Sequence, residues 1–241
     1  GILKMSLTRT STRANSSIRK VEVIADFCPH AMGSVLFGTG NTRVICAATV
    51  TGDVPEHAAK KNEGWLSAEY TMLPYSTLSR KKRDTVKRDG RSVEIQRLIG
   101  RSLRAAVDFS MLPGISMFID CDVVQADGGT RTAAITGGYI AMKLAFAKML
   151  QSGMINVNPL KTNIAAISVG VVNNELLLDL DYSEDSKASV DMNIVMDGSF
   201  NLIEIQGTGE QAPFSIKSMN QMVDLACSGI SRLFEIQNSC C

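Results

Sequence analysis

Histidine is scarce in this sequence, and its scarcity limits the chemistry that the chain can perform. Only two histidines occur in 241 residues, His30 and His57. A metal site built from several histidines and a serine–histidine–aspartate triad are therefore not expected. The sequence also contains no Gly-Lys dipeptide, which excludes the P-loop of many nucleotide-binding proteins. Any catalysis has to come from carboxylates, arginines, lysines, hydroxyl groups or a metal ion that they bind.

Cys-x-x-Cys motifs and long apolar runs are absent as well. The six cysteines, at positions 28, 46, 121, 227, 240 and 241, form no Cys-x-x-Cys pair, and four lie inside apolar segments. Free thiols of this kind are typical of reducing compartments, so we expect a cytoplasmic protein. No apolar run approaches the roughly 18 residues of a membrane-spanning helix, so no membrane partner is expected. The residues before Met5 resemble an expression remnant rather than a signal peptide.

The charges nearly balance over the whole chain but are strongly segregated along it. There are 25 basic and 24 acidic residues. Ten cations lie between Arg80 and Arg104, where only three acids oppose them. A basic segment of this kind indicates a polyanionic partner. Nine acids lie between Asn173 and Glu210, which is typical of a place that binds a divalent cation.

The hydropathy pattern predicts an α+β protein. Residues 1–17 are rich in Ser, Thr and Arg, and we expect them to form a flexible segment before a single domain of residues 18–238. The expected strands are 21–26, 34–37, 43–50, 65–73, 115–125, 164–172, 175–181, 189–196 and 201–206, and the expected helices are 93–109, 132–150 and 216–236. This order favours mixed or antiparallel sheets covered by helices, in two loosely similar halves.

A glycine-rich turn, Gly128-Gly129-Thr130-Arg131, lies between an expected strand and an expected helix. Paired glycines allow close backbone approach, and a helix N-terminus supplies free N–H donors. Because the turn adds a hydroxyl and a guanidinium group, it has the parts of a phosphate site. Arg91, just before another expected helix, could bind the same anion. The alternatives are a turn capped by Thr130 that binds nothing and a solvated Arg91, and the pattern alone leaves both open.

Two acidic residues stand six positions apart in the acidic segment. Asp185 lies in an expected loop, and Asp191 lies at the start of an apolar strand between Val190 and Met192. A carboxylate in such a strand is costly unless it is paired, hydrogen-bonded or bound to a metal ion. Two carboxylates that meet there can bind Mg²⁺, which needs few protein ligands. The alternative is an ordinary turn acid and an ordinary acid at the start of a strand.

Four long segments, taken together, form a specific pattern. They are residues 64–74, 90–104, 120–132 and 184–193, with the sequences GWLSAEYTMLP, GRSVEIQRLIGRSLR, DCDVVQADGGTRT and EDSKASVDMN. In this order they resemble the ribonuclease PH family, and the resemblance extends from about Arg13 to Gln237. The chain departs from the family's pattern at Tyr75, where arginine is common, and over Thr8–Arg19.

The resemblance implies a fold and an activity. The fold is a pair of βαβ-type halves with mixed sheets covered by helices, assembled as a homohexameric ring, a trimer of dimers. The activity is phosphate-dependent 3′→5′ trimming of tRNA precursors, a tRNA nucleotidyltransferase reaction that releases nucleoside diphosphates. An RNA-threading, non-catalytic exosome-type ring subunit and a plain RNA-binding module are the alternatives. Helix 93–109 has a row of arginines opposite its apolar face, namely Arg97, Arg101 and Arg104. The ring implies that this row contacts a neighbouring subunit or RNA.

The resemblance also assigns roles to residues. It places inorganic phosphate, the co-substrate, at Arg91, Gly129, Thr130 and Arg131. It makes Asp185 and Asp191 the catalytic acids, and these are also the expected ligands of Mg²⁺. The partner is then RNA rather than DNA, and the residues expected to contact its backbone are Arg80, Lys81, Lys82, Arg83, Lys87 and Arg88.

Overall fold

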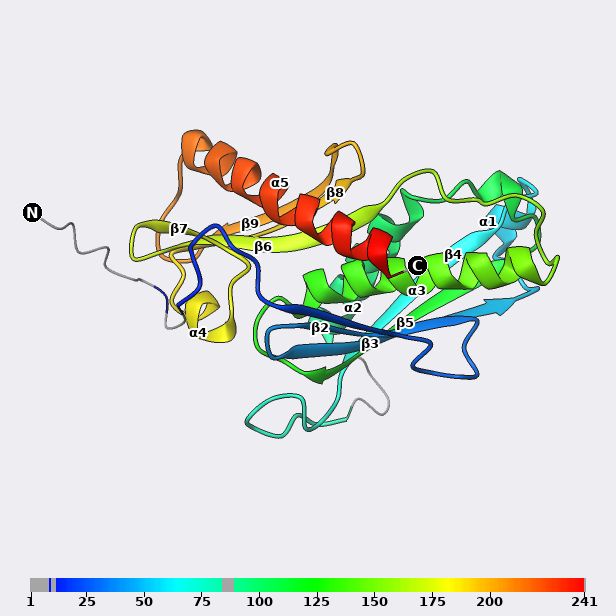
Figure 1. Cartoon of the computed structure of the whole chain (residues 1–241), viewed down its shortest axis with the longest axis horizontal. Coiled ribbons are helices and arrows are strands. Elements are labelled where there is room, and N and C mark those ends of the chain that lie inside the picture. The colour runs from blue at the N-terminus through cyan, green and yellow to red at the C-terminus, as the bar shows by residue number, and fades with distance from the viewer. Residues whose placement is uncertain (1–8, 10–11, 84–88, 241) are drawn as a thin grey trace, which may run out of the picture.

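Two sheets and the helices packed around them make up the protein (Figure 1). The computed structural model describes residue 9 and residues 12–83 and 89–240. Strands and helices do not segregate into separate regions, and each half of the chain contributes one sheet and at least one long helix. The predicted α+β class is confirmed.

The first sheet is mixed. It contains β1 (Val21–Ala25), β2 (Gly33–Thr39), β3 (Thr42–Thr51), β4 (Trp65–Met72) and β5 (Ser116–Gln125), in the order β1-β2-β3-β5-β4. Strand β4 is parallel to β5, and the other neighbours are antiparallel. Helix α2 (Gly90–Arg104) joins the parallel pair, so this half contains a βαβ unit. A short helix, α1 (Glu56–Ala59), and a 3₁₀ turn, Phe109–Met111, lie in the connections.

The second sheet is antiparallel throughout. It contains β6 (Ile164–Val172), β7 (Glu175–Leu178), β8 (Val190–Asp197) and β9 (Leu202–Gly209), in the order β7-β6-β8-β9. The short helix α4 (Tyr182–Asp185) connects β7 to β8. Helix α5 (Ile216–Ser239) follows β9 and packs on β6. Mixed strand directions and the βαβ unit are therefore confined to the first half of the described chain, whereas the family resemblance implied them in both halves.

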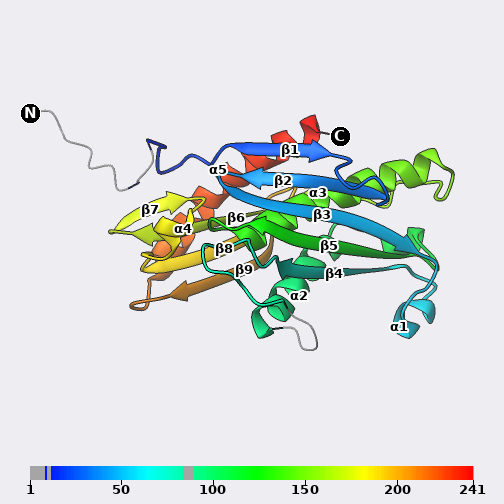
Figure 2. The ribbon, with the colours of Figure 1, turned by 90° about the horizontal axis from the view of Figure 1, so that it is seen from below.

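Helix α3 (Thr130–Gln151) lies between the two sheets. It packs against β2 and β3 of the first sheet and against β6 of the second (Figures 1 and 2). A single hydrophobic core includes residues of both sheets and of this helix. Among the described helices, α3 alone is long and apolar enough to cross a membrane, but 72% of its apolar window is buried inside the protein. This burial is what a core helix of a globular fold shows.

Two local expectations near the predicted site differ from the structure. Helix α2 begins at Gly90 rather than at position 93, because the Asp89 carboxylate accepts a hydrogen bond from the Ser92 N–H at 2.6 Å and caps the helix. Arg91 therefore lies inside the first helical turn. Asp185 ends helix α4 rather than lying in a loop. A helix of four residues is too short to show a hydropathy period, so the sequence pattern gave no sign of it.

The arginine row of α2 is largely used within the chain. The Arg101 guanidinium makes two contacts with the Glu204 carboxylate, at 2.6 and 3.0 Å. The Arg104 guanidinium lies 4.9 Å from the centre of the Trp65 ring, in a cation–π arrangement. Arg101 and Arg104 therefore have partners within the chain, and the use of the row in subunit or RNA contact stays a prediction. Arg97 is exposed.

The first described residues are bound to the second half of the chain. Arg9 is buried, and its guanidinium lies 3.0 Å from the carboxylate of buried Glu184. Arg13 donates a hydrogen bond to the main-chain oxygen of Asp179 at 2.9 Å. Buried charges require such partners, so the contacts of these two residues count against flexibility at their positions in the segment 1–17, which was expected to be flexible. Residues 1–8 and 10–11 lie outside the described part of the chain.

We expect Gly33→Ala to destabilise the protein by about 1–3 kcal/mol, the usual cost of overpacking a core. A Cβ atom at Gly33 would lie 2.3 Å from the main-chain oxygen of Ala141, so α3 would have to shift. Thermal unfolding measures the loss. Gly52→Ala is the control, because a Cβ atom there meets nothing within 4 Å. Equal unfolding midpoints for the two variants would contradict the tight contact between β2 and α3.

Candidate active site

A cleft with a volume of about 640 Å³ brings together all six residues predicted for phosphate binding and acid catalysis. Helix α2 contributes one of them, the glycine turn and the start of α3 contribute three, and α4 and β8 contribute the two acids. The six are Arg91, Gly129, Thr130, Arg131, Asp185 and Asp191. The cations therefore come from the first half of the chain and the acids from the second.

The glycine turn has a conformation that only glycine adopts without strain. Gly128 and Gly129 have φ angles of 73° and 64°, in the left-handed region. A Cβ atom at Gly128 would lie 2.7 Å from the main-chain oxygen of Leu180, so the turn also touches the second half of the chain. Gly129 is the N-cap residue of α3 and Thr130 its first residue, which corrects the alternative in which Thr130 caps the helix. The first N–H groups of α3 have no intrahelical acceptor and can bind an anion.

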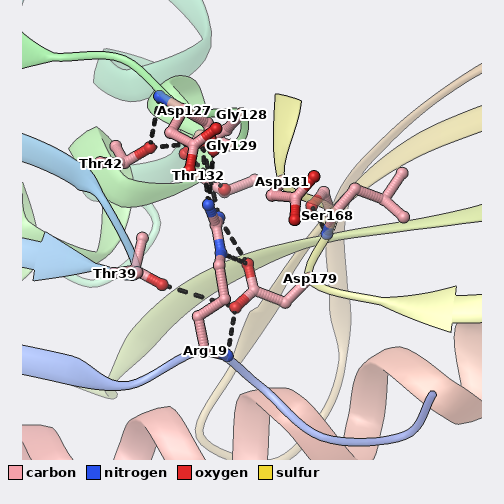
Figure 3. Close-up of polar contacts among 12 residues, drawn as sticks. Arg19, Thr39, Thr42, Asp127, Gly128, Gly129, Thr132, Ser168, Asp179 and Asp181 are labelled. Carbon is pink, nitrogen blue, oxygen red and sulfur yellow. Dashed lines mark hydrogen bonds and ion pairs between the residues drawn. The ribbon is translucent and has the colours of Figure 1, made fainter. Parts of the chain in front are cut away.

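A buried ion pair between Arg19 and Asp179 holds this turn in place (Figure 3). The Asp179 carboxylate accepts hydrogen bonds from Nε and Nη2 of Arg19, at 3.1 and 2.7 Å, and from the main-chain N–H of Arg19, at 2.7 Å. Nη1 of Arg19 donates to the main-chain oxygen of Asp127 at 2.6 Å. The Thr42 hydroxyl donates to the Gly128 oxygen at 2.7 Å and accepts from the Asp127 N–H at 3.0 Å. Arg19 and Thr42 thus bind the main-chain oxygens of Asp127 and Gly128.

The two acids of the cleft have raised pKa values. Burial is the main cause for Asp191, whose pKa is raised to about 6, and the nearby Asp185 carboxylate raises it further. Burial also raises the pKa of Asp185, although Arg91 and Arg131 partly offset the effect. The charges of Arg91 and Arg131 therefore lower the pKa values of the two carboxyl groups with which they share the cleft. Together they make one electrostatic unit in which each acid disfavours ionisation of the other.

Arg131 is held at the edge of the cleft by polar contacts. It donates a hydrogen bond to the Gln206 side-chain oxygen at 2.8 Å and lies 3.4 Å from the Glu94 carboxylate. Glu94 is half exposed, so this ion pair is weak and can give way to a stronger anion. Arg91 is exposed at the start of α2. Both guanidinium groups are thus accessible to a phosphate that enters the cleft.

The residues predicted to contact RNA are only partly brought to this cleft. Lys81 lines it, whereas the other described members of the set, Arg80, Lys82 and Arg83, are exposed and do not. Lys87 and Arg88 lie outside the described residues. The cleft also has lining residues that the sequence interpretation did not identify, including Tyr182 and Asn193. Asn193 stands two positions after Asp191, and the two-residue period of a strand places both on one face.

Comparison with known proteins gives the family. The model of the 3′ exoribonuclease family, domain 1, matches residues 17–147, and that of domain 2 matches residues 162–229. The chain is also 50% identical over 230 residues to "Ribonuclease PH" of Neisseria meningitidis serogroup C, covering 95% of each chain. The chain belongs to the ribonuclease PH family of 3′ exoribonucleases. "Ribonuclease PH" of Bacillus pumilus is 49% identical over 234 residues, covering 96% of this chain and 97% of the relative.

Solved structures of more distant relatives confirm the ribonuclease PH fold. The structure of rice (Oryza sativa) Rrp46 superposes with a TM-score of 0.77 at 17% identity, covering 95% of this chain and 98% of that one. A chain of the Archaeoglobus fulgidus exosome with RNA bound to the active site has a TM-score of 0.76 at 20% identity, covering 96% and 92%. At these identities the likeness concerns the fold alone.

The two acids also fit a magnesium site of a particular kind. Over residues 12–83 and 89–240, no group of three or more histidine, cysteine or acidic side chains is arranged to bind a metal ion. Asp185 and Asp191 nevertheless share the cleft and interact electrostatically. Mg²⁺ commonly binds one or two carboxylates together with waters and substrate phosphates. The donor set therefore fits a magnesium ion that arrives with an anionic substrate better than a permanently caged one.

We expect Asp191→Asn to raise the unfolding midpoint at pH 7.5 in metal-free buffer. With a pKa raised from 3.8 to about 6, the ionised carboxylate destabilises the folded state by about 1–3 kcal/mol at pH values above 6. At pH 4 the carboxyl group is protonated in the folded state and about half protonated in the unfolded state, so most of this gain from the substitution disappears. Thermal unfolding of both proteins at pH 7.5 and pH 4 measures it. A variant that is less stable than the wild type at pH 7.5 would contradict the raised pKa.

Proposed function

We propose that this protein is a phosphate-dependent 3′→5′ exoribonuclease that trims the 3′ ends of tRNA precursors and releases nucleoside diphosphates. The observation that carries the proposal is the single cleft that unites two arginines, a helix N-terminus and two acids. Identity of about 50% to proteins named Ribonuclease PH, over nearly the whole chain, supports the same activity. Residues 18–238 then act as one catalytic domain, which the hydrophobic core common to both sheets supports.

The cleft suits phosphate as the nucleophile. Arg91, Arg131, the Thr130 hydroxyl and the free N–H groups at the start of α3 bind the phosphate and offset its repulsion from the RNA backbone. A phosphate oxygen attacks the phosphorus of the terminal phosphodiester, and the bond to the 3′-oxygen of the preceding nucleotide breaks. The products are a nucleoside 5′-diphosphate and an RNA shortened by one residue. Positioning two anions in line is the main task of the protein groups.

Asp185 and Asp191 serve the leaving 3′-oxygen. They are the residues that would bind Mg²⁺, and the ion, when bound, stabilises negative charge on that oxygen. In the alternative role, without a bound ion, Asp191 retains its proton more readily than an ordinary aspartate, because its pKa is about 6, and it donates this proton to the leaving oxygen. Both roles place the acids opposite the arginines across the scissile bond. Phosphate and Mg²⁺ are accordingly the proposed co-substrate and cofactor.

The basic segment serves RNA binding. Lys81 lines the cleft, and its neighbours in the sequence, Arg80, Lys82 and Arg83, are exposed to solvent. Together with Lys87 and Arg88 they provide the positive charge that tracks a single-stranded RNA backbone without reading its sequence. The described cysteines are free thiols, which supports a cytoplasmic location. The proposed partner is RNA, not DNA or a membrane.

Trimming of a 3′-extended tRNA precursor is expected to require inorganic phosphate. With phosphate, nucleoside diphosphates appear, and with excess nucleoside diphosphates the reaction runs backwards and extends the RNA. Chromatography of the released nucleotides, with and without phosphate, measures this. Nucleoside monophosphates released in phosphate-free buffer would refute the proposal. An inactive protein that still binds the RNA would instead favour a non-catalytic, exosome-type ring subunit.

A homohexameric ring, a trimer of dimers, is the proposed assembly. Light scattering is expected to give about six times the chain mass of 26.0 kDa. In a ring, basic segments of neighbouring subunits can bind one long RNA, which raises avidity without new contacts. Charge reversal at the exposed Arg97 is expected to lower the assembly state or the RNA affinity, with the unfolding midpoint unchanged. A monomer that is fully active on long precursors at micromolar concentration would contradict the assembly.

A further inference from the structure

A buried tyrosine stands directly behind the phosphate-binding hydroxyl of the proposed site. Tyr70 belongs to β4 and is only 3% exposed. Its phenol oxygen lies 2.8 Å from the Thr130 hydroxyl oxygen, within hydrogen-bonding distance. Thr130 lines the cleft, whereas Tyr70 does not. The phenol therefore reaches the cleft only through Thr130.

The direction of this hydrogen bond determines what Thr130 can offer to a ligand. Each hydroxyl has one proton, and either oxygen can be the donor in the bond between them. If Thr130 donates to Tyr70, its proton is not available to the cleft. If Tyr70 donates to Thr130, the Thr130 proton is free to point toward an anion.

The surroundings favour the second direction. A phenol is protonated at neutral pH, and burial raises the pKa of Tyr70 further, although the hydrogen bond with Thr130 and the charges of Arg91 and Arg131 act in the opposite sense. These same two arginines line the cleft beside Thr130, and they attract an anion to it. Phosphate at neutral pH is mainly an acceptor of hydrogen bonds, so it selects the arrangement in which Thr130 donates to it and Tyr70 donates to Thr130.

We propose that Tyr70 is a positioning residue for phosphate, which donates its phenol proton to Thr130 so that the Thr130 hydroxyl is oriented as a donor into the cleft. The inference rests on the proposed function, because phosphate is the anion assigned to the cleft. Tyr70 touches neither phosphate nor RNA, so its effect is confined to the affinity for phosphate and is transmitted through a single hydroxyl group.

The test is the Tyr70→Phe variant, which removes one oxygen atom and keeps the ring. We expect the KM for phosphate in the trimming reaction to rise about two- to tenfold, the effect of one hydrogen bond, with kcat within twofold of the wild type. Tyr139→Phe is the matched control. Its phenol is also buried in the core and donates to the Asn163 side-chain oxygen at 2.9 Å, but it does not line the cleft. The control is expected to lose stability without a change in the KM for phosphate.

A double variant shows whether the effect passes through Thr130. Thr130→Val removes the hydroxyl, so adding Tyr70→Phe to it is expected to change the KM for phosphate by less than twofold, whereas Thr130→Ser retains the full Tyr70 effect. Equal effects of Tyr70→Phe with threonine and with valine at position 130 would overturn the proposal. So would an unchanged KM in Tyr70→Phe, or the same rise in Tyr139→Phe.

A binding measurement separates this inference from the proposed function. Inorganic phosphate is expected to raise the unfolding midpoint of the wild type, and to do so less at equal concentration for Tyr70→Phe than for Tyr139→Phe. This readout needs no trimming activity, so it supports or refutes the role of Tyr70 even if the trimming reaction does not use phosphate. A wild-type protein that phosphate does not stabilise would overturn the inference.

Discussion

The candidate site depends on one buried ion pair, that between Arg19 and Asp179. The two residues lie 160 positions apart, and the pair links the segment that precedes β1 to the turn between β7 and α4. The remaining Arg19 donors bind the main-chain oxygens of Asp127 and Gly128. A buried ion pair adds little net stability, but the loss of one partner leaves an unpaired buried charge at a cost of about 3–5 kcal/mol. Its effect is therefore to fix the glycine turn relative to the acids.

This link explains how left-handed backbone conformations are maintained around the cleft. Asp179 itself has a φ angle of 56°, which is unfavourable for a residue with a side chain. Its carboxylate accepts three hydrogen bonds from Arg19, and these compensate for the strain. Three residues later the chain enters α4, whose last residue is Asp185. A strained residue held by a buried charge thus sets the position at which the acid-bearing helix starts.

The sequence predicts the elements well where hydropathy or turn chemistry is regular. The hairpin between β2 and β3 follows from Gly40 and Asn41 in its turn, and all nine described strands were expected at nearly the correct positions. The start of α2 was misplaced because one capping carboxylate, Asp89, determines it rather than the period. The six residues of the cleft were identified from their chemistry and from the family resemblance. That they share one cleft depends on tertiary contacts that no local pattern contains.

The supporting residues could not be predicted, for a common physical reason. Arg19, Thr42 and Tyr70 are buried polar residues, and each acts on the cleft through a partner far along the chain. In the sequence, Tyr70 follows Leu66 and Ala68 at the two-residue spacing of any core residue of a strand. Its hydroxyl acquires a role only because β4 pairs with β5 and the turn after β5 brings Thr130 beside it. The groups that contact a substrate can thus be inferred from residue type and spacing, whereas the groups that orient them require the fold.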